Sequence, residues 1–417
     1  MSKHALVSFK RDKHIRTEIT LTGSKSECNR ALIISSLSKG KVKVENMSDA
    51  ADTVTLNRIL NSLSSGHPQR QTVDVGPAGT AMRFLTAYLS VQTGDFLLTG
   101  TERMKQRPIG ILAEALKSIG ASLSYAEQNG FPPLEIKGPF RQRSEKVSIK
   151  GDISSQYISA LLMIAPALPE GLRLEIEGEL TSLPYVKMTL DMLKESGISY
   201  TWNNNVISIS SQPFSGATLT VEPDWSAASY WYSIAALSEQ AEISLPYLKE
   251  KSLQGDSRIR EIMTAFGVAT QQTAKGIAIS TAEKHFDGAV LNLKDCPDLA
   301  QTIIVCAAAL GKNLAFTGLE TLKIKETDRI AALQAELSKI GVVLTEDNLI
   351  YTLDCSGLNF PQRVRFKTYE DHRMAMAFAP LALLIDEVVL EEMNVVEKSY
   401  PAFWQDLEKA GFIVNVI

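Results

Sequence analysis

The sequence predicts an α/β protein with two similar halves, each made of three small modules wrapped round three buried helices. Two observations predict this fold class. Amphipathic helices that end in glycine recur six times along the 417 residues, and helices that are apolar nearly all round recur six times in phase with them. Each module then contains one buried helix, one amphipathic helix and several short strands.

The first series consists of amphipathic helices that close with a glycine before an apolar or alternating segment. Glycine supplies the left-handed turn that ends a helix before a strand begins. These residues are Gly66, Gly120, Gly197, Gly267, Gly341 and Gly411, and the copy at Gly66 is the weakest. Because they are spaced roughly 70 residues apart, each module is a small α/β unit, longer than an ordinary solenoid repeat.

The second series consists of segments that begin with a polar cluster and continue as a helix without a polar face. Such helices must lie inside a domain. The segments span residues 24–37, 78–90, 154–168, 224–237, 296–310 and 370–384. Two groups of three, with a boundary near Glu222, is the simplest packing. The periodicity leaves open whether the N-terminal strand belongs to the first group.

Composition and charge exclude several classes of protein. Lys and Arg number 43 against 47 Asp and Glu, a net charge of -4 that is not typical of a nucleic-acid or membrane-surface protein. The cysteines and histidines show no metal-ligand or disulfide spacing, and no nucleotide-binding loop is present, so we expect neither a metal nor a cofactor. Without a long apolar run or a secretory signal, the sequence predicts a soluble, cytoplasmic protein.

The polar starts of the buried helices are candidate anion sites, because a helix N-terminus presents free N–H groups and a partial positive charge. Each polar residue there could instead be an ordinary helix cap. Cations at the mouth of a buried helix, such as Lys25 and Arg373, are costly unless they are paired, which favours the anion site. The other candidates at these starts are Ser26, Arg30, Gly79, Ser154, Ser155 and Gln156.

Three loops add further charge. RMKQRP contains Arg107, KIKETDR contains Lys325, Glu326 and Arg329, and EDHR contains His372 and Arg373. Each loop alone is more often a solvated face, but so many cations near helix starts favour a substrate with several phosphate or carboxylate groups. Glu326 and Asp298 are then candidates for proton transfer, with an N-cap as the alternative for Asp298.

Eight motifs together resemble the 5-enolpyruvylshikimate-3-phosphate synthase family along nearly the whole chain. They are GSKSECNRAL, AGTAMR, LTGTERMKQRPIG, SSQYISALLM, SLPYVKMTL, QGD, KETDRI and DHRMAM. The resemblance implies two similar globular domains, each of three βαβαββ units around buried parallel helices, with the active site in the interdomain cleft. It also implies a discontinuous outer domain of residues 1–22 plus 223–417, and an inner domain of residues 23–222.

The resemblance implies transfer of the enolpyruvyl group of phosphoenolpyruvate to the 5-hydroxyl of shikimate 3-phosphate, without cofactor and in a monomer. Asp298, Glu326 and Lys25 would be catalytic. Shikimate 3-phosphate would be bound by Lys25, Ser26, Arg30, Ser154, Ser155, Gln156, Ser182, Tyr185, Asp298, Thr321 and Lys325. Phosphoenolpyruvate would be bound by Lys25, Gly79, Arg107, Gln156, Arg329, His372, Arg373 and Lys398.

The chain departs from the family pattern at several positions near the expected site. Pro77 stands where Asn is usual, Phe84 where Pro is usual, and Thr321 where Asn is common. Leu183 replaces a common Lys, and Cys28 a frequent Ser. None of these changes removes a charged catalytic group, so we expect activity with altered affinities.

Two alternatives accompany this interpretation. One is the related enolpyruvyl transferase that acts on UDP-N-acetylglucosamine, which carries a cysteine in a mobile loop, whereas Cys28 lies in a helix start. The other is a catalytically silent anion-binding protein of the same fold, against which the retained carboxylates and cations argue.

Overall fold

The computed structural model describes residues 3–10, 12–63, 69–286, 288 and 290–417. The chain divides into two compact units, which we call the split unit (Met1–Thr22 with Glu222–Ile417) and the continuous unit (Gly23–Val221). Glu222 falls in the split unit, one residue from the boundary that the sequence suggested. Its carboxylate accepts hydrogen bonds there from Trp225 Nε1 at 2.7 Å and from Ser252 Oγ at 2.6 Å.

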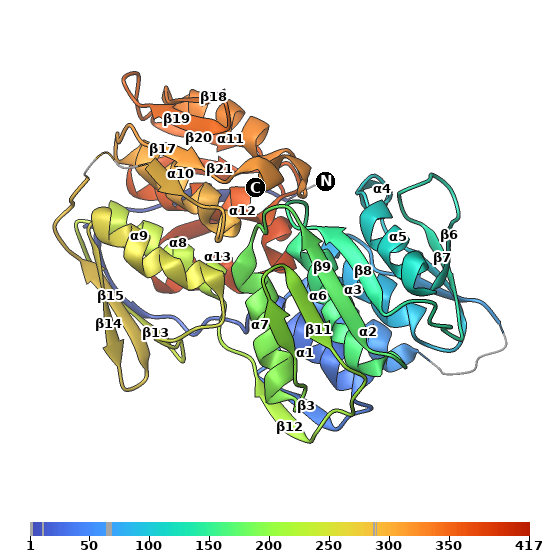
Figure 1. Cartoon of the computed structure of the whole chain (residues 1–417). Coiled ribbons are helices and arrows are strands. Elements are labelled where there is room, and N and C mark those ends of the chain that lie inside the picture. The colour runs from blue at the N-terminus through green and yellow to red at the C-terminus, as the bar shows by residue number, and fades with distance from the viewer. Residues whose placement is uncertain (1–2, 11, 64–68, 287, 289) are drawn as a thin grey trace. The chain divides into compact units, whose positions relative to one another are not determined.

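The continuous unit contains ten strands and a set of helices in its described part (Figure 1). The strands are β3 (Val42–Glu45), β4 (Gln71–Asp74), β5 (Asp95–Thr99), β6 (Ser122–Tyr125), β7 (Leu134–Lys137), β8 (Lys146–Lys150), β9 (Leu172–Glu177), β10 (Thr201–Asn203), β11 (Val206–Ile209) and β12 (Ala217–Thr220). The helices are α1 (Lys25–Leu37), α2 (Ala51–Ser62), α3 (Gly79–Ser90), α4 (Glu102–Lys105), α5 (Gly110–Ile119), α6 (Ser155–Ile164), the 3-10 turn η1 (Ala165–Ala167) and α7 (Leu183–Glu195).

The split unit contains the remaining strands and helices. The strands are β1 (Ala5–Ser8), β2 (His14–Glu18), β13 (Gln240–Pro246), β14 (Val268–Thr273), β15 (Gly276–Thr281), β16 (Val290–Asn292), β17 (Ala315–Thr317), β18 (Val343–Asp347), β19 (Ile350–Asp354), β20 (Arg363–Phe366), β21 (Glu387–Leu390) and β22 (Ile413–Val416). The α-helices are α8 (Trp225–Leu237), α9 (Ile259–Ala265), α10 (Ala300–Ala309), α11 (Arg329–Leu337), α12 (His372–Phe378) and α13 (Phe403–Lys409). The 3-10 turns are η2 (Gly255–Arg258), η3 (Pro297–Leu299), η4 (Glu320–Ile324), η5 (Ser338–Ile340), η6 (Ala379–Leu383) and η7 (Met393–Lys398).

Each four-stranded sheet repeats one mixed pattern, in which a parallel pair is extended by two strands that pair antiparallel. In the sheet β4-β5-β7-β6, for example, β4 and β5 are parallel with Val73 opposite Leu98, and β7 pairs antiparallel with both β5 and β6. In four of these five sheets the parallel strands are joined through a buried helix, as β4 and β5 are by α3, whereas the chain between β2 and β13 passes through the whole continuous unit. The pattern matches one small α/β module per sheet.

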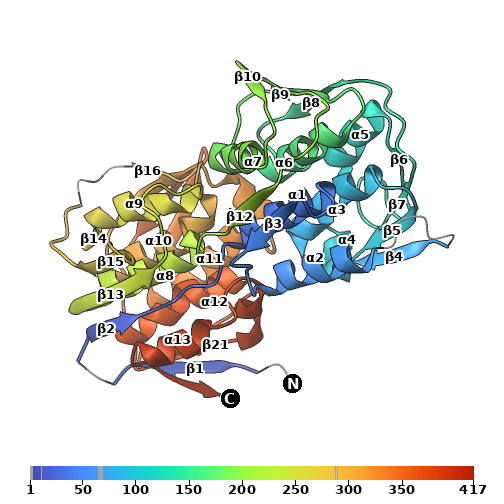
Figure 2. The ribbon, with the colours of Figure 1, turned by 90° about the horizontal axis from the view of Figure 1, so that it is seen from below.

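The chain passes between the two units twice, once after β2 and once after β12. Strand β2 pairs in parallel with β13 in the split unit, yet the chain leads from β2 into α1 of the continuous unit. Strand β12 pairs in parallel with β3 in the continuous unit, yet the chain leads from β12 into α8. Figure 2 shows β12 beside β3 and β2 beside β13. At each crossing, the last strand before the crossing therefore pairs within the unit that the chain leaves.

Strand β1 answers the question that periodicity left open. It lies between β21 and β22 in the split unit and pairs antiparallel with both, with Leu6 opposite Val389 and Asn415. The N-terminal segment therefore completes the sheet of the last module. Within the described part of the chain, none of the helices is both long and apolar enough to span a membrane.

The two predicted series of helices are present, with two ends that differ. The apolar helices are buried, and every residue of α8 and of α10 is inaccessible to solvent or nearly so. The predicted helices 154–168 and 370–384 change to 3-10 turns after Ile164 and Phe378, because Pro166 and Pro380 cannot donate the next α-helical hydrogen bond. Positive φ angles between 76° and 117° follow the amphipathic helices at Gly120, Gly197, Gly267, Gly341 and Gly411, whereas Gly66 lies outside the described residues.

Candidate functional site

The starts of the three buried helices of the split unit meet around the guanidinium of Arg373. Arg373 is the second residue of α12, and its Nη2 lies 3.3 Å from the hydroxyl of Ser226 at the start of α8. The same Nη2 lies 2.9 Å from Oδ2 of Asp298, which precedes α10. Nη1 lies 3.4 Å from the hydroxyl of Tyr230. A buried cation therefore gathers polar groups from all three helices.

Arg329 begins the amphipathic helix α11 and is surrounded by three carboxylates. Its Nε lies 2.7 Å from Asp371 Oδ2, Nη1 lies 3.2 Å from Asp298 Oδ1, and Nη2 lies 2.9 Å from Glu326 Oε2. Burial alone would lower the pKa of Arg329, but these three carboxylates raise it above its usual value. Only 2% of the side chain is exposed, so its charge is compensated inside the protein.

Asp298 does not cap a helix, which was the alternative to a chemical role. It lies in η3, whose cap residue makes no side-chain hydrogen bond, and its two oxygens face Arg329 and Arg373. Burial alone would raise the pKa of Asp298, but Arg373, Lys325 and Arg329 hold it well below its usual range. The side chain is still 20% exposed, so an ionised carboxylate is accessible at this position.

Four other predicted residues belong to the split unit. Lys398 ends η7, and its Nζ lies 3.0 Å from Glu326 Oε1, which links it to the same cluster. His372 is buried, with Nδ1 3.5 Å from Asp371 Oδ1. Lys325 follows η4 and is one of the cations that lower the pKa of Asp298. Thr321 lies within η4, earlier in the same loop.

Lys25 begins α1 in the continuous unit and faces a buried carboxylate. Its Nζ lies 3.4 Å from Asp52 Oδ2 of α2, and the two side chains are 14% and 4% exposed. Ser24 is the residue that caps α1, accepting a hydrogen bond from the N–H of Glu27. The hydroxyl of Ser26, one residue into the helix, is thus not the cap, although Ser26 contributes its carbonyl to Arg30.

Arg30 is a buried cation held mainly by hydroxyl groups. Its Nε donates to Thr189 Oγ1 at 2.7 Å, Nη2 donates to Ser159 Oγ at 3.0 Å, and Nη1 donates to the carbonyl of Ser26 at 2.8 Å. The guanidinium lies 5.3 Å from the ring of Phe84 and 5.9 Å from that of Tyr185. Burial lowers the pKa of Arg30 to about 10. Glu27, three residues earlier in α1, is a nearby carboxylate whose charge opposes part of this lowering.

Gly79 and Arg107 are in direct contact. A β-carbon built on Gly79, the first residue of α3, would lie 2.5 Å from Arg107 Nη1. The other cations of this loop point elsewhere, because Arg103 bonds Gln106 and Lys105 pairs with Glu102 and Glu127. From RMKQRP, the structure brings Arg107 to the start of a buried helix.

The start of α6 combines a cap with a contact to α3. Ser154 caps the helix by accepting from the N–H of Gln156, and Gln156 Nε2 donates to Thr80 Oγ1 at 3.2 Å. Ser155 is the first helical residue and is buried. Ser182, the N-cap residue of α7, has a left-handed backbone with φ of 57° and accepts no cap hydrogen bond. The capping alternative therefore holds for Ser154.

The candidate residues thus fall into two groups, one in each unit. Asp298, Glu326, Arg329, Arg373 and Lys398 form one connected set of ion pairs, whereas Lys25, Arg30 and Arg107 have separate surroundings. Sequence reasoning missed several partners that hold these groups in place. They are Asp52, Ser159, Thr189, Ser226, Tyr230 and Asp256. QGD was the only signal for Asp256, as a motif without an assigned role.

No group of three or more His, Cys, Asp and Glu side chains within the described ranges is arranged to hold a metal ion. The four cysteines, Cys28, Cys296, Cys306 and Cys355, are buried free thiols. Burial raises the pKa of Cys28 to about 11, and the N–H of Ser48 lies 3.5 Å from its sulfur. Cys28 is therefore a protonated, buried side chain in α1.

Comparisons with known proteins give one consistent result. The profile of the family described as EPSP synthase (3-phosphoshikimate 1-carboxyvinyltransferase) matches residues 9–407. A 3-phosphoshikimate 1-carboxyvinyltransferase of Bacteroides fragilis is 48% identical over 404 residues, covering 96% of this chain and 97% of that protein. The protein of the same name from Shewanella loihica is 32% identical over 412 residues, covering 93% of this chain and 95% of that protein.

A solved structure of EPSP synthase from Acinetobacter baumannii has the same fold. It matches with a TM-score of 0.79 at 20% sequence identity, and the match covers 99% of this chain and 100% of that chain. A second structure of EPSP synthase from the same organism matches with a TM-score of 0.76. The predicted α/β fold class is confirmed.

Proposed function

The chain belongs to the EPSP synthase (3-phosphoshikimate 1-carboxyvinyltransferase) family, and we propose that it transfers the enolpyruvyl group of phosphoenolpyruvate to the 5-hydroxyl of shikimate 3-phosphate. Phosphate is released, and the reaction belongs to the shikimate pathway of aromatic amino-acid biosynthesis. The observation that carries the proposal is the ion-pair set in which Arg329, Arg373 and Lys398 share the carboxylates of Asp298 and Glu326. It places cations for an anionic substrate beside groups that can move protons.

The reaction proceeds by addition and elimination. In the addition, the 5-oxygen of shikimate 3-phosphate bonds to C2 of phosphoenolpyruvate, the hydroxyl proton leaves to a base, and C3 gains a proton. In the elimination, the bond from C2 to the phosphate oxygen breaks, C3 loses a proton, and phosphate departs. Two groups that exchange protons are therefore needed, one at the hydroxyl and one at C3.

We assign the proton transfers to three residues. Asp298 takes the proton of the attacking hydroxyl, since its carboxylate is 20% exposed at this position beside Arg329 and Arg373. Glu326 and Lys25 serve the carbon atoms of phosphoenolpyruvate. Lys398 and Arg329 both contact Glu326 and hold its carboxylate in this position.

We assign the binding groups to the two substrates, with Lys25 and Gln156 shared by both. Phosphoenolpyruvate is bound by Lys25, Gly79, Arg107, Gln156, Arg329, His372, Arg373 and Lys398. Shikimate 3-phosphate is bound by Lys25, Ser26, Arg30, Ser154, Ser155, Gln156, Ser182, Tyr185, Asp298, Thr321 and Lys325. The hydroxyl acceptors of Arg30 support a role with the shikimate carboxylate, since an arriving anion would form stronger, charge-assisted hydrogen bonds than these neutral groups do. We propose that the enzyme works as a cytoplasmic monomer on these two small molecules alone.

Release of phosphate from the purified protein tests this function. With both phosphoenolpyruvate and shikimate 3-phosphate we expect turnover, and with either substrate alone we expect none. UDP-N-acetylglucosamine in place of shikimate 3-phosphate should give no release, and release with it would favour the related transferase.

The variant Asp298→Asn separates an enzyme from a silent anion-binding protein. The amide keeps the shape of the side chain but cannot take a proton, so turnover should fall by about 100-fold or more while both substrates still bind. Calorimetric titration measures the binding. No turnover by the parent protein, with both anions bound, would favour the silent protein.

A further inference from the structure

Arg373 is held on several sides by side chains from other elements of the split unit. Asp298, in η3, lies 2.9 Å from Nη2. Two residues of α8 add further contacts: Tyr230 lies 3.4 Å from Nη1, and Ser226 lies 3.3 Å from Nη2. The side chain is only 6% exposed. Small displacements of any one of these partners would therefore move the guanidinium.

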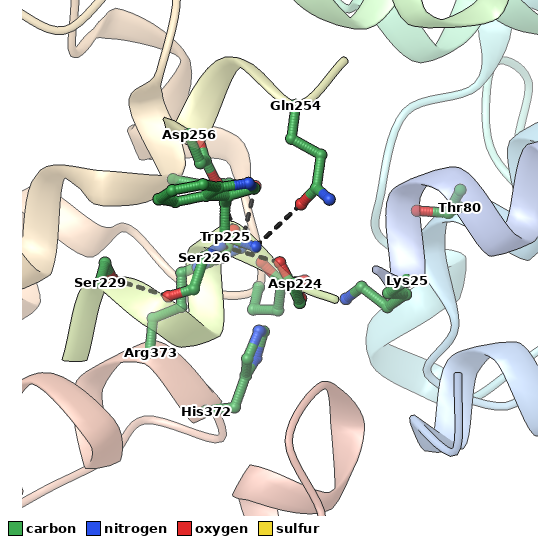
Figure 3. A network of polar contacts seen from close by, with 12 residues as sticks. Lys25, Thr80, Asp224, Trp225, Ser226, Ser229, Gln254, Asp256, His372 and Arg373 are labelled. Carbon is green, nitrogen blue, oxygen red and sulfur yellow. Dashed lines mark hydrogen bonds and ion pairs between the residues drawn. The ribbon is translucent and has the colours of Figure 1, made fainter. Parts of the chain in front are cut away.

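The hydroxyl of Ser226 is not needed to cap its helix. Asp224 is the N-cap of α8 and accepts the hydrogen bond from the N–H of Ser226. The Ser226 hydroxyl instead donates to Oδ2 of Asp256 in η2, and its oxygen lies in reach of Arg373 Nη2. Figure 3 shows Ser226 near Asp256 and Arg373. One hydroxyl thus connects a buried carboxylate with a buried cation.

Asp256 is buried, at 3% exposure, and only one of its oxygens is engaged. Oδ2 receives the hydrogen bond from Ser226, whereas Oδ1 has no partner among the described residues. A buried carboxyl with an open oxygen is costly and is not a device for stability. We therefore look for the role of Asp256 in its hydrogen bond with Ser226.

We propose that Asp256 and Ser226 are positioning residues that fix the guanidinium of Arg373, through the chain Asp256–Ser226–Arg373–Asp298, in the orientation that binds phosphoenolpyruvate. This inference rests on the proposed function, in which Arg373 binds that substrate. Asp298 and Ser226 contact the same nitrogen, Nη2. The carboxyl groups of Asp298 and Asp256 therefore restrain this end of the guanidinium together, the first directly and the second through Ser226. Loss of either Asp256 or Ser226 lets Arg373 swing toward Asp298 alone.

The charges around Asp256 support a coupled arrangement. Burial, followed by the charge of Asp298, raises the pKa of Asp256 to about 7, against the lowering effects of Arg373 and the Ser226 hydrogen bond. The other titratable groups that face it are Asp224 at the start of α8 and Cys296 before η3. Phosphoenolpyruvate, which brings negative charge to Arg373, would thus act on the protonation of Asp256 as well.

Steady-state kinetics of Ser226→Ala, Asp256→Ala and Asp256→Asn test the proposal. For Ser226→Ala and Asp256→Ala, the KM for phosphoenolpyruvate should rise by about tenfold or more, because a misplaced group binds its anion poorly. The KM for shikimate 3-phosphate should stay within about twofold of the parent value. Asp256→Asn keeps an acceptor for Ser226, so it should restore most of the phosphoenolpyruvate affinity.

Two matched controls exclude a general effect of removing buried polar groups. Ser233→Ala removes another buried hydroxyl from α8, and Asp406→Asn neutralises a buried carboxylate in α13 that bonds Tyr400 and Lys409. Neither contacts Arg373, so both should leave the KM for phosphoenolpyruvate unchanged. Thermal melting of each variant establishes that the protein measured is folded.

The outcomes separate this inference from the function on which it rests. A parent protein that releases no phosphate with both substrates overturns both. An active parent whose Ser226→Ala and Asp256→Ala variants keep the KM for phosphoenolpyruvate, or lose affinity equally for both substrates, overturns the positioning role alone. An Asp256→Asn variant as impaired as Asp256→Ala would also contradict it, since the hydrogen bond would then be irrelevant.

Discussion

Arg329 and Asp371 form a two-point ion pair inside the split unit. Arg329 Nε donates to Asp371 Oδ2 at 2.7 Å, and Nη2 donates to Oδ1 at 3.4 Å. The side chains are 2% and 0% exposed, so water does not screen the pair. Because Arg329 begins α11 and Asp371 caps α12, the pair fixes the start of one helix against the start of another.

Asp371→Asn should lower the free energy of unfolding. Asn remains a good helix cap, so the variant removes charge rather than the cap. Breaking a buried ion pair costs up to about 3 kcal/mol, and we expect a smaller loss here because Arg329 keeps Asp298 and Glu326 as partners. Urea unfolding measures the change. Asp354→Asn, at an exposed carboxylate that bonds Ser356, is the matched control and should unfold like the parent. Equal stability of both variants would contradict the prediction.

The repeat of helices could be predicted because it is a local property of the sequence. A glycine after an amphipathic stretch and a helix without a polar face each show within about fifteen residues. The ends at Pro166 and Pro380 could have been predicted too, because a proline interrupts α-helical hydrogen bonding wherever it occurs. The pairing of β2 with β13 could not be predicted, because more than two hundred residues separate these strands along the chain.

The residues that hold the site groups in place were harder to predict for the same reason. Arg30 is bound by Thr189 and Ser159, which lie 159 and 129 positions away, and Arg373 contacts Ser226 across 147 positions. Serines and threonines of this kind are common caps and surface residues, so type and periodicity do not mark them. Cations at helix starts were found because their charge is conspicuous in a buried helix, whereas neutral partners carry no such signal.

Gly79→Ala should impair use of phosphoenolpyruvate without loss of stability. The new methyl group would lie 2.5 Å from Arg107 Nη1, so the end of this flexible side chain must move. The backbone of Gly79 is helical, and alanine favours a helix by about 1 kcal/mol over glycine. We expect the KM for phosphoenolpyruvate to rise several-fold, with the KM for shikimate 3-phosphate unchanged.

Gly216→Ala is the matched control for Gly79→Ala. A β-carbon at Gly216 has no neighbour closer than the carbonyl of Lys41 at 4.0 Å. Its kinetic constants should equal those of the parent. If Gly79→Ala also leaves the KM for phosphoenolpyruvate unchanged, Arg107 does not bind that substrate.

The pair of Lys25 and Asp52 allows stability and activity to be separated. Lys25→Met leaves the Asp52 carboxylate buried without its cation, which should cost about 3 kcal/mol and abolish turnover. The double variant Lys25→Met with Asp52→Asn removes both charges, so unfolding in urea should recover toward the parent value. Phosphate release should remain absent. Recovery of activity along with stability would show that Lys25 is only structural.

Asp256→Asn should change how stability depends on pH. Burial and the nearby Asp298 raise the pKa of Asp256 to about 7, above the value of about 3.9 for an exposed aspartate. The protonated form is favoured in the fold, so the contribution of this protonation to the free energy of unfolding is complete below about pH 4 and is lost as the pH rises through about 7. The amide cannot ionise, so the variant should gain stability relative to the parent between about pH 5 and pH 8.5. Urea unfolding at both pH values measures this, and a difference that stays constant would place the ionisation elsewhere.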